Sequence, residues 1–384
     1  MARRDIIVVG GSAGGIEALL RVLGNLPADL PAAICVTIHQ AAYAPNRRPA
    51  IFSRAGRLPV VSAEQGMRIE PGTVYLAVPD HHLFIERAAD SDHGVLRLAR
   101  GPRENRSRPA IDPLFRSAAL AFGPRVIGVV LSGALDDGVS GLWVIKDRGG
   151  ISVVQDPVDA LVSSMPVHAI EESLADHILP ASGMGALLGE LTRAPLRVQP
   201  PPDLGNPMDQ QTGKGQRRDA RADLEQEVAI AKMEEGAHQA EDRPGVPSRF
   251  TCPDCGGVLW NTHPKGAPLH FRCETGHAYS AAVLAEGQTE AVEGAMWAAV
   301  RALEDKAALA RLRADYAHER GQASQVEHFE IQVRSAQQHA SAIRDLLRLD
   351  GASGTRPTVA EDVREPREDE GGDRPVLGHK TSSV

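Results

Sequence analysis

Four short runs of aliphatic residues, spaced through the first 198 residues, constrain the fold of this chain most strongly. These runs are DIIVVG (5–10), AICVTIH (33–39), VIGVVLSG (126–133) and ISVVQ (151–155). They are β-branched and apolar on both faces, as parallel strands covered on both sides tend to be. Between them, residues 15–27 and 113–123 show the apolar spacing of helices. The alternation predicts an α/β fold with a doubly wound, mostly parallel sheet and helices on both faces.

A second pair of apolar segments has a different character. We interpret VYLAVPDHHLFIE (74–86) and GVLRLAR (94–100) as a more exposed hairpin, which would make the sheet mixed.

Changes in composition divide the chain into five parts. Pro, Gly and charged residues dominate after about residue 198, which predicts a linker, with a short helix over 223–235 compatible with its pattern. The tail is charged and low in hydrophobicity, which favours disorder. The predicted parts are an α/β domain (1–198), a linker (199–248), a Cys/His module (249–280), a helical hairpin (281–350) and a disordered tail (351–384).

The hairpin prediction rests on two apolar seams. Apolar residues recur at spacings of three and four from Met296 to Ala310 and again from Val326 to Leu347. The two seams pair most simply as a helical hairpin that turns near residues 319–324. The alternative is a coiled-coil dimer through these helices.

The net charge, the aromatic content and the length of the apolar runs argue against several classes of function. A net charge of −8 and an aromatic content of 4% argue against a nucleic-acid partner. No apolar run approaches the roughly 20 residues that a membrane span needs. The apolar part of MARRDIIVVGG is too short for a secretory signal, which needs roughly 7–15 such residues. We expect a cytoplasmic protein without membrane insertion.

Three polar residues stand at equivalent places in the predicted sheet. Ser12 follows the first strand, His39 closes the second, and Asp137 lies in the turn SGALDDG after the third. In open α/β sheets, ligands bind beyond the carboxyl ends of the strands. A hydroxyl, an imidazole and a carboxylate on one edge are the parts of a nucleophile, a base and an acid that orients the base.

The turn around Ser12 admits more than one interpretation. GGSAG (10–14) has the G-x-S-x-G spacing of a nucleophile elbow, and a helix that starts near Gly14 would direct N–H groups at an oxyanion. A dinucleotide-binding turn is the alternative. The second glycine of G-x-G-x-x-G is absent, however, and His39 stands where an Asp or Glu would be expected. The turn alone leaves both interpretations open.

Six motifs in order resemble the CheB-type protein-glutamate methylesterase domain. The motifs are VVGGSAGG, VTIHQ, PGTVYLAVPDHHLFIE, SRPAIDPLFRSAA, GVVLSGALDDGVSGL and VVQDPVDALVSSMPVHAI, and the similarity runs from Asp5 to Leu191. The resemblance implies a doubly wound α/β esterase with a Ser-His-Asp triad on Ser12, His39 and Asp137. It also implies hydrolysis of γ-glutamyl methyl esters on the cytoplasmic helices of methylated chemoreceptors or a related signalling protein, sometimes with glutamine deamidation.

The sequence departs from the pattern of that family at three points. The family usually carries an N-terminal receiver domain that uncovers the site, and we expect this switch to be missing because the similarity begins at Asp5. Ala13 stands where the family often has Thr, and Ala134 stands where it usually has Met beside the oxyanion site. Both changes are tolerable if backbone N–H groups form the oxyanion hole.

Other polar residues are weaker candidates. His81 and His82 could line the cleft or form a hairpin tip, Asp112 fits a helix N-cap before Pro113, and Asp136 is the rival acid. Three arginines could contact an acidic substrate or be solvated in a loop: Arg103, Arg106 and Arg108.

A Cys/His cluster predicts a structural metal site. The spacing is Cys252-x2-Cys255 followed by Cys273-x3-His277, which is typical of a zinc-ribbon-like module. Four ligands close a tetrahedral Zn²⁺ site and leave no position for substrate. His263 and His270 are alternative fourth ligands.

The sequence therefore predicts a serine esterase of the methylesterase type that needs no cofactor for catalysis. The alternative from another class is a non-catalytic signalling protein that uses the esterase scaffold and the zinc-ribbon-like module to bind partners.

Overall fold

The computed structural model describes residues 3–45, 47–88, 92–172, 174–196, 220–237, 245–263 and 266–353. Most of the predicted linker and all of the predicted tail after residue 353 lie outside the described residues.

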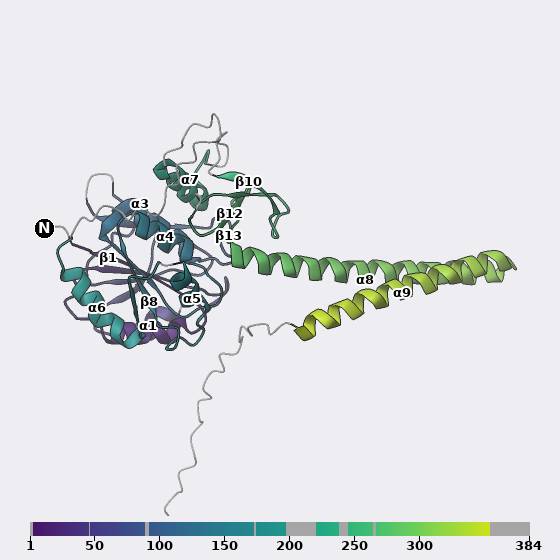
Figure 1. Cartoon of the computed structure of the whole chain (residues 1–384), viewed down its shortest axis with the longest axis horizontal. Coiled ribbons are helices and arrows are strands. Elements are labelled where there is room, and N and C mark those ends of the chain that lie inside the picture. Colours follow the sequence, from purple (N-terminus) through teal and green to yellow (C-terminus); the bar gives the residue numbers. More distant parts are fainter. Residues whose placement is uncertain are drawn as a thin grey trace, which may run out of the picture.

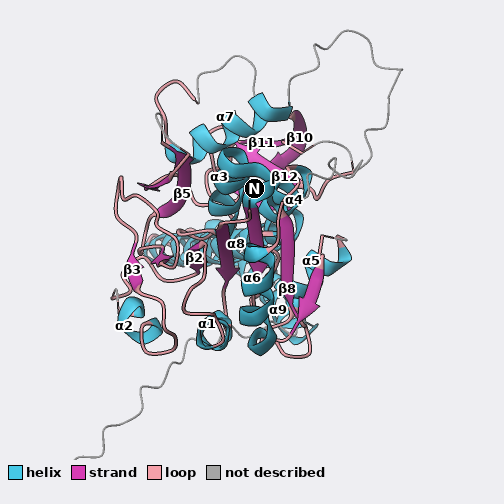
Figure 2. Cartoon of the chain, turned by 90° about the vertical axis from the view of Figure 1, so that its left-hand side faces the viewer, coloured by secondary structure: helices cyan, strands magenta, loops and turns pink. Residues whose placement is uncertain are grey.

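A seven-stranded sheet forms the centre of the first half of the chain (Figures 1 and 2). Its order is β3-β4-β2-β1-β7-β8-β9, and every neighbouring pair is parallel. The strands are β1 (Ile6–Gly11), β2 (Ala33–Ile38), β3 (Val60–Ser62), β4 (Val74–Leu76), β7 (Val126–Val130), β8 (Ile151–Gln155) and β9 (His177–Leu179). The doubly wound, mostly parallel sheet predicted from the strand–helix alternation is confirmed.

Helices cover both faces of this sheet, because its central strands are apolar on both sides. Ile7 and Val9 of β1 pack into one core with helices α1 (Gly15–Gly24) and α6 (Ala181–Arg193). The alternate residues Ile6 and Val8 pack into a second core on the other face. The helices of that face are α3 (Ile111–Phe122), α4 (Val139–Asp147) and α5 (Ser164–Glu171). A short helix, α2 (Arg48–Phe52), and a 3₁₀ turn, η1 (Gly123–Arg125), complete the domain.

The expected hairpin is confirmed over residues 82–99, but its first strand is buried and not exposed. β4 joins the parallel sheet, while β5 (His82–Arg87) and β6 (Gly94–Ala99) form a separate antiparallel pair. Leu83, Phe84 and Ile85 are consecutive and all buried in the core that contains α3. A strand that is covered on both faces in this way does not show the alternation of a solvent-facing hairpin.

The predicted linker contains a helix that belongs to the α/β domain. α7 (Ala220–Lys232) packs against α3, and Leu224, Val228 and Ala231 join the same core. Treating residues 220–232 as linker was therefore wrong, because their apolar face is buried.

A small antiparallel sheet follows, which we call the β-module (residues 246–280). Its four strands are β10 (Val246–Thr251), β11 (Val258–Asn261), β12 (His270–Cys273) and β13 (Ala278–Ser280). Its own core gathers Leu259, Phe271 and Tyr279 with the first turn of the next helix.

Two long helices follow the β-module and extend away from the α/β domain (Figure 1). α8 (Ala281–Glu319) and α9 (Ala323–Ser353) pack against each other as a hairpin, and Gly321 turns between them with φ 70°. Buried alanines and Phe329 line the seam. In the parts of the chain that the structure describes, no helix combines the length and apolarity that a bilayer crossing requires.

Candidate active site

The structure brings Ser12, His39 and Asp137 together at the carboxyl edge of the sheet. His39 Nδ1 lies 3.1 Å from Ser12 Oγ, and His39 Nε2 lies 2.6 Å from Asp137 Oδ2. A carboxylate can only accept, so Nε2 carries the proton and Nδ1 is free to accept from the serine hydroxyl. The arrangement is that of a nucleophile, its base and the acid that orients the base.

The turn that presents Ser12 depends on glycine. Ser12 N–H donates to the Ser132 carbonyl at 2.9 Å, and α1 begins three residues later. Gly14 has φ 76°, and a Cβ there would lie 2.5 Å from Ser132 Oγ and 2.7 Å from Leu161 Cβ. Only glycine adopts this positive φ easily and leaves the space beside Ser132 and Leu161 free, which explains the glycine at position 14.

His39 is fixed through its backbone. Its N–H donates to the Gly11 carbonyl at 3.1 Å, and its carbonyl accepts from Arg48 Nη2 at 2.9 Å. The first bond ties the end of β2 to β1 and the second ties it to α2, and the imidazole faces Ser12.

Asp137 is buried and surrounded by donors. Its Oδ2 accepts from the Ile111 N–H at 2.7 Å, and its Oδ1 accepts from Asn105 Nδ2 at 2.7 Å. Burial raises the pKa of Asp137, but the bonds from His39, Ile111 and Asn105 outweigh it and hold the pKa below its usual range. Asp137 is therefore the ionised acid of the group.

Asp112 is not the N-cap that its sequence context suggested. Ala110 takes that position, and Asp112 lies inside the first turn of α3. Pro113 is tolerated in this turn because the backbone N–H groups there have no acceptor within the helix, so the N–H that proline lacks is not missed. The carboxyl of Asp112 accepts from the Gly141 N–H at 2.6 Å and from Asn105 Nδ2 at 3.0 Å. Burial and the charge of Asp137 raise its pKa well above the usual range. Of the two carboxyls, Asp137 is therefore the one that ionises more readily.

The other candidates lie away from the Ser12 hydroxyl. His82 is fully buried and contacts the Pro102 carbonyl and the Ala110 N–H, while His81 contacts the Pro79 carbonyl. Asp136 accepts from the Ser280 hydroxyl, and it is Asp137 that contacts His39.

Two of the three loop arginines have side-chain partners within the chain. Arg108 donates to Asp80 and to the Gly101 carbonyl, and Arg106 pairs with Glu290 of α8. The Arg103 carbonyl accepts from the Ala278 N–H of the β-module.

Asn105 is the functional residue that sequence reasoning missed. It is 7% exposed, has φ 47°, and bonds both Asp112 and Asp137. Asn tolerates positive φ, but RENRSRP shows nothing else that separates a buried asparagine from a solvated one.

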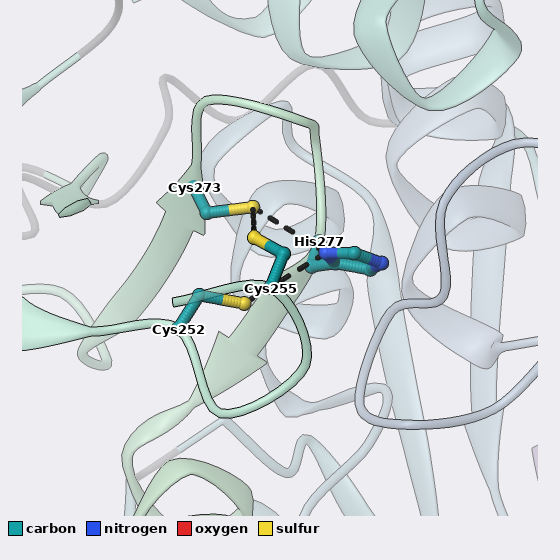
Figure 3. Close-up of side chains that lie close together, drawn as sticks. All are labelled: Cys252, Cys255, Cys273 and His277. Atoms are coloured by element: carbon teal, nitrogen blue, oxygen red, sulfur yellow. Dashed lines mark hydrogen bonds between the residues drawn. The ribbon is translucent and has the colours of Figure 1, made fainter. Parts of the chain in front are cut away.

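Cys252, Cys255, Cys273 and His277 lie together in the β-module (Figure 3). Cys255 Sγ is 3.7 Å from Cys273 Sγ, and His277 Nδ1 is 3.7 Å from Cys252 Sγ and 3.5 Å from Cys273 Sγ. Zn–S bonds of about 2.3 Å would give a regular tetrahedron with edges of about 3.8 Å. These residues fit a Zn²⁺ ion as they stand.

The proposed alternative ligands lie in a different cluster. His263 and His270 gather with Glu227 of α7, so neither completes the cysteine site. Arg116 Nη1 lies 3.4 Å from His270 Nε2, and Arg116 Nε lies 3.7 Å from Glu227. Because a guanidinium already neutralises the carboxylate and adjoins the imidazole, this cluster disfavours a metal cation.

Comparisons with known proteins match the first half of the chain. A family model described as CheB methylesterase matches residues 7–188. A putative protein-glutamate methylesterase/protein-glutamine glutaminase of Leptospira interrogans is 38% identical over 175 residues, which cover 46% of this chain and 88% of that protein. A protein-glutamate methylesterase/protein-glutamine glutaminase 2 of Anaeromyxobacter dehalogenans is 38% identical over 192 residues, covering 50% of this chain and 54% of its own length.

A solved structure is also similar. The chain aligns with the CheB methylesterase catalytic domain of Thermotoga maritima at 32% identity and a TM-score of 0.47, covering 50% of this chain and 100% of that domain. The family model ends at residue 188, before the β-module and the hairpin begin.

Proposed function

The chain belongs to the CheB methylesterase family, as its six motifs predicted, and we propose that it hydrolyses glutamate γ-methyl esters of proteins with Ser12, His39 and Asp137. The observation that carries the proposal is the pair of contacts from Ser12 Oγ through the His39 ring to the Asp137 carboxylate. This arrangement activates a hydroxyl, which is otherwise a weak nucleophile at neutral pH.

The reaction runs in two steps. Ser12 Oγ attacks the ester carbonyl while His39 Nδ1 takes the hydroxyl proton, and Asp137 stabilises the resulting imidazolium. The imidazolium then protonates the methoxide oxygen, so methanol leaves and an acyl-serine remains. Water attacks this ester with His39 again as base, which releases the free glutamate and restores the Ser12 hydroxyl.

The N-terminal turn of α1 supports an oxyanion hole built from the backbone. α1 begins at Gly15, so the first turn and the positive end of its dipole adjoin Ser12. The Gly15 N–H itself donates to the Ser12 carbonyl, so any oxyanion donors are other N–H groups of this turn. One such donor is typically worth about 3–4 kcal/mol of barrier. Ala13 and Ala134 keep their backbone N–H groups, so the Thr and Met that the family uses there are dispensable in this proposal.

The substrate class follows from the family. We propose that the partner is the helical cytoplasmic region of a methylated chemoreceptor or a related signalling protein, which also places the enzyme in the cytoplasm. The relatives bear the additional name protein-glutamine glutaminase. Glutamine deamidation uses the same attack on an acyl carbon, with ammonia as the leaving group.

We further propose that Cys252, Cys255, Cys273 and His277 hold a structural Zn²⁺ ion. The support is that three of the six distances between their ligand atoms are 3.5–3.7 Å and that all four atoms lie within 4.8 Å of one another. Four protein ligands close the coordination sphere, so the ion would stabilise the β-module and take no part in catalysis.

Release of methanol from a methylated receptor tests the catalytic assignment. Ser12→Ala should reduce release to background, while the circular-dichroism spectrum and metal content stay those of the wild type. Release by this variant at the wild-type rate would contradict the assignment. A folded wild type that neither releases methanol nor reacts with a fluorophosphonate probe would favour the non-catalytic signalling protein.

A further inference from the structure

The loop that carries Asp137 is held from outside the α/β domain. This acid loop (residues 131–138) connects β7 to α4, and three consecutive residues in it, Leu135, Asp136 and Asp137, are linked to the β-module or to the start of α8. The links meet around Ser280, where β13 ends and α8 begins.

The most direct link runs through Asn105. The Ser280 N–H donates to Asn105 Oδ1 at 2.8 Å, and Asn105 Nδ2 donates to Asp137 Oδ1 at 2.7 Å. Carboxylates accept and backbone N–H groups donate, so only one orientation of the amide satisfies both neighbours. The Ser280 N–H therefore fixes the amide orientation in which Asn105 Nδ2 can donate to Asp137.

Two further contacts hold the neighbouring residues of the loop. Asp136 accepts from the Ser280 hydroxyl, and Ser280 in turn is the N-cap of α8 and accepts from the Val283 N–H. Leu135, at φ 61°, packs against the β-module core. A non-glycine residue persists at positive φ only when its surroundings compensate for the strain.

The segment before Asn105 is anchored by buried charges. Glu104 is fully buried and pairs with Arg116 of α3 and, at 2.9 Å, with Arg272 of β12. The Asn105 N–H also donates to the Ala278 carbonyl at 2.8 Å. The β-module is therefore docked on the α/β domain by specific buried bonds at the residues that support Asp137.

We propose that Asn105 is a positioning residue for Asp137, and that the junction of β13 and α8, through the Ser280 N–H, is part of the support of the active site. The proposal rests on the assigned triad. It gives the C-terminal half of the chain a defined role, which is to keep the acid of the triad in the orientation that His39 requires.

A pair of substitutions at one position isolates the N–H of Ser280. Ser280→Pro removes the N–H and the hydroxyl, whereas Ser280→Ala removes the hydroxyl alone. The backbone accepts proline, because Ser280 has φ −68° and Tyr279 precedes it in a strand. The difference between the two variants therefore reports the bond to Asn105.

We expect kcat to fall about tenfold further in Ser280→Pro than in Ser280→Ala, with KM for the methylated receptor unchanged, since a bond that orients a charged group is lost. The His39 Nε2 proton, which is bonded to Asp137, gives a second readout by NMR on ¹⁵N-histidine-labelled protein. Its downfield signal should be kept in Ser280→Ala and be lost or displaced in Ser280→Pro.

Asn105→Ala provides an independent variant if Ser280→Pro does not fold. It should show the same loss of kcat and the same change in the His39 signal. Wild-type kcat and an unchanged signal in the folded variants would overturn the proposal. A wild type without esterase activity would refute the proposed function, while the NMR signal would still report whether the junction orients Asp137.

Discussion

At the scale of single residues, Gly14 decides whether Ser12 can be presented at all. Gly14→Ala forces a side chain into a left-handed backbone and against Ser132 and Leu161. We expect kcat/KM for methanol release to fall at least about tenfold and stability to fall by about 1–3 kcal/mol. Thermal unfolding and the methanol assay measure the two effects.

Gly66 supplies a matched control for that substitution. It has φ 77°, but a Cβ there meets nothing within 4 Å. Gly66→Ala should share the cost in backbone strain and keep the wild-type activity. Equal activity in the two variants would show that crowding around Ser12 is irrelevant.

The pair of buried acids allows a second test at this scale. Asparagine resembles a protonated carboxyl, so Asp112→Asn should retain activity within a few-fold, while Asp137→Asn should lose about 10⁴-fold in kcat, as in other triads. The raised pKa of Asp112 stabilises the fold at low pH, and this contribution is lost as pH rises through the folded-state pKa.

Denaturant unfolding at several pH values measures how the contribution of Asp112 to stability changes with pH. Relative to the wild type, Asp112→Asn should become more stable as pH rises above 4, because in the wild type the Asp112 carboxyl then ionises in the unfolded chain but not in the core, and the variant lacks this carboxyl. A larger loss of activity in Asp112→Asn than in Asp137→Asn would reverse the two roles.

The contrast between Ser12 and Asn105 shows what the sequence reveals at this scale. Ser12, His39 and Asp137 each follow an apolar run, so the strand pattern alone places them on one edge. Asn105 lies in an irregular loop, and its partner Ser280 is 175 positions away. No local pattern encodes a contact of that separation.

At the scale of elements, Glu104 joins α3 to β12. Burial raises its pKa, but Arg116 and Arg272 outweigh burial and bring the pKa to about 2, from 4.5. A lowered pKa stabilises the fold above the unfolded value, and this contribution is lost as pH falls from about 4.5 towards 2.

Glu104→Gln should therefore cost about 3–5 kcal/mol of stability at neutral pH. The buried guanidinium groups of Arg116 and Arg272 lose their nearest carboxylate and keep only longer contacts with Glu227. The variant should also lose less stability than the wild type as the pH falls from 4.5 to 2. Chemical denaturation measures both. Glu64→Gln, at an exposed position, should stay within about 0.5 kcal/mol of the wild type.

The elements that were predicted only in part share a cause. The strands β1, β2, β7 and β8 are apolar runs and were recognisable, as were the seams of α8 and α9. A short helix was predicted near α7, but its place in a core depends on contacts with α3 and β6. The hairpin was predicted as well, but the burial of β5 was not, because burial on both faces erases alternation. Tertiary packing, which local patterns do not contain, decided both cases.

At the scale of the whole molecule, the proposed zinc ion and the esterase site belong to one structure. Purified protein should contain about one zinc per chain, measured by mass spectrometry of metals. A chelator should increase hydrogen exchange in residues 246–280 and reduce methanol release. Cys35 serves as an internal control, because burial raises its thiol pKa and it should stay unreactive before and after chelation. Protein without metal and with the same exchange pattern would exclude the ion.

The length of α8 has a mechanical consequence. The helix contains 39 residues, which corresponds to about 58 Å, and its N-cap Ser280 donates to Asp136, the neighbour of Asp137. A force that is applied near residue 319 therefore acts at a distance of about 58 Å from this junction and would load the contacts of Ser280 with Asp136 and Asn105.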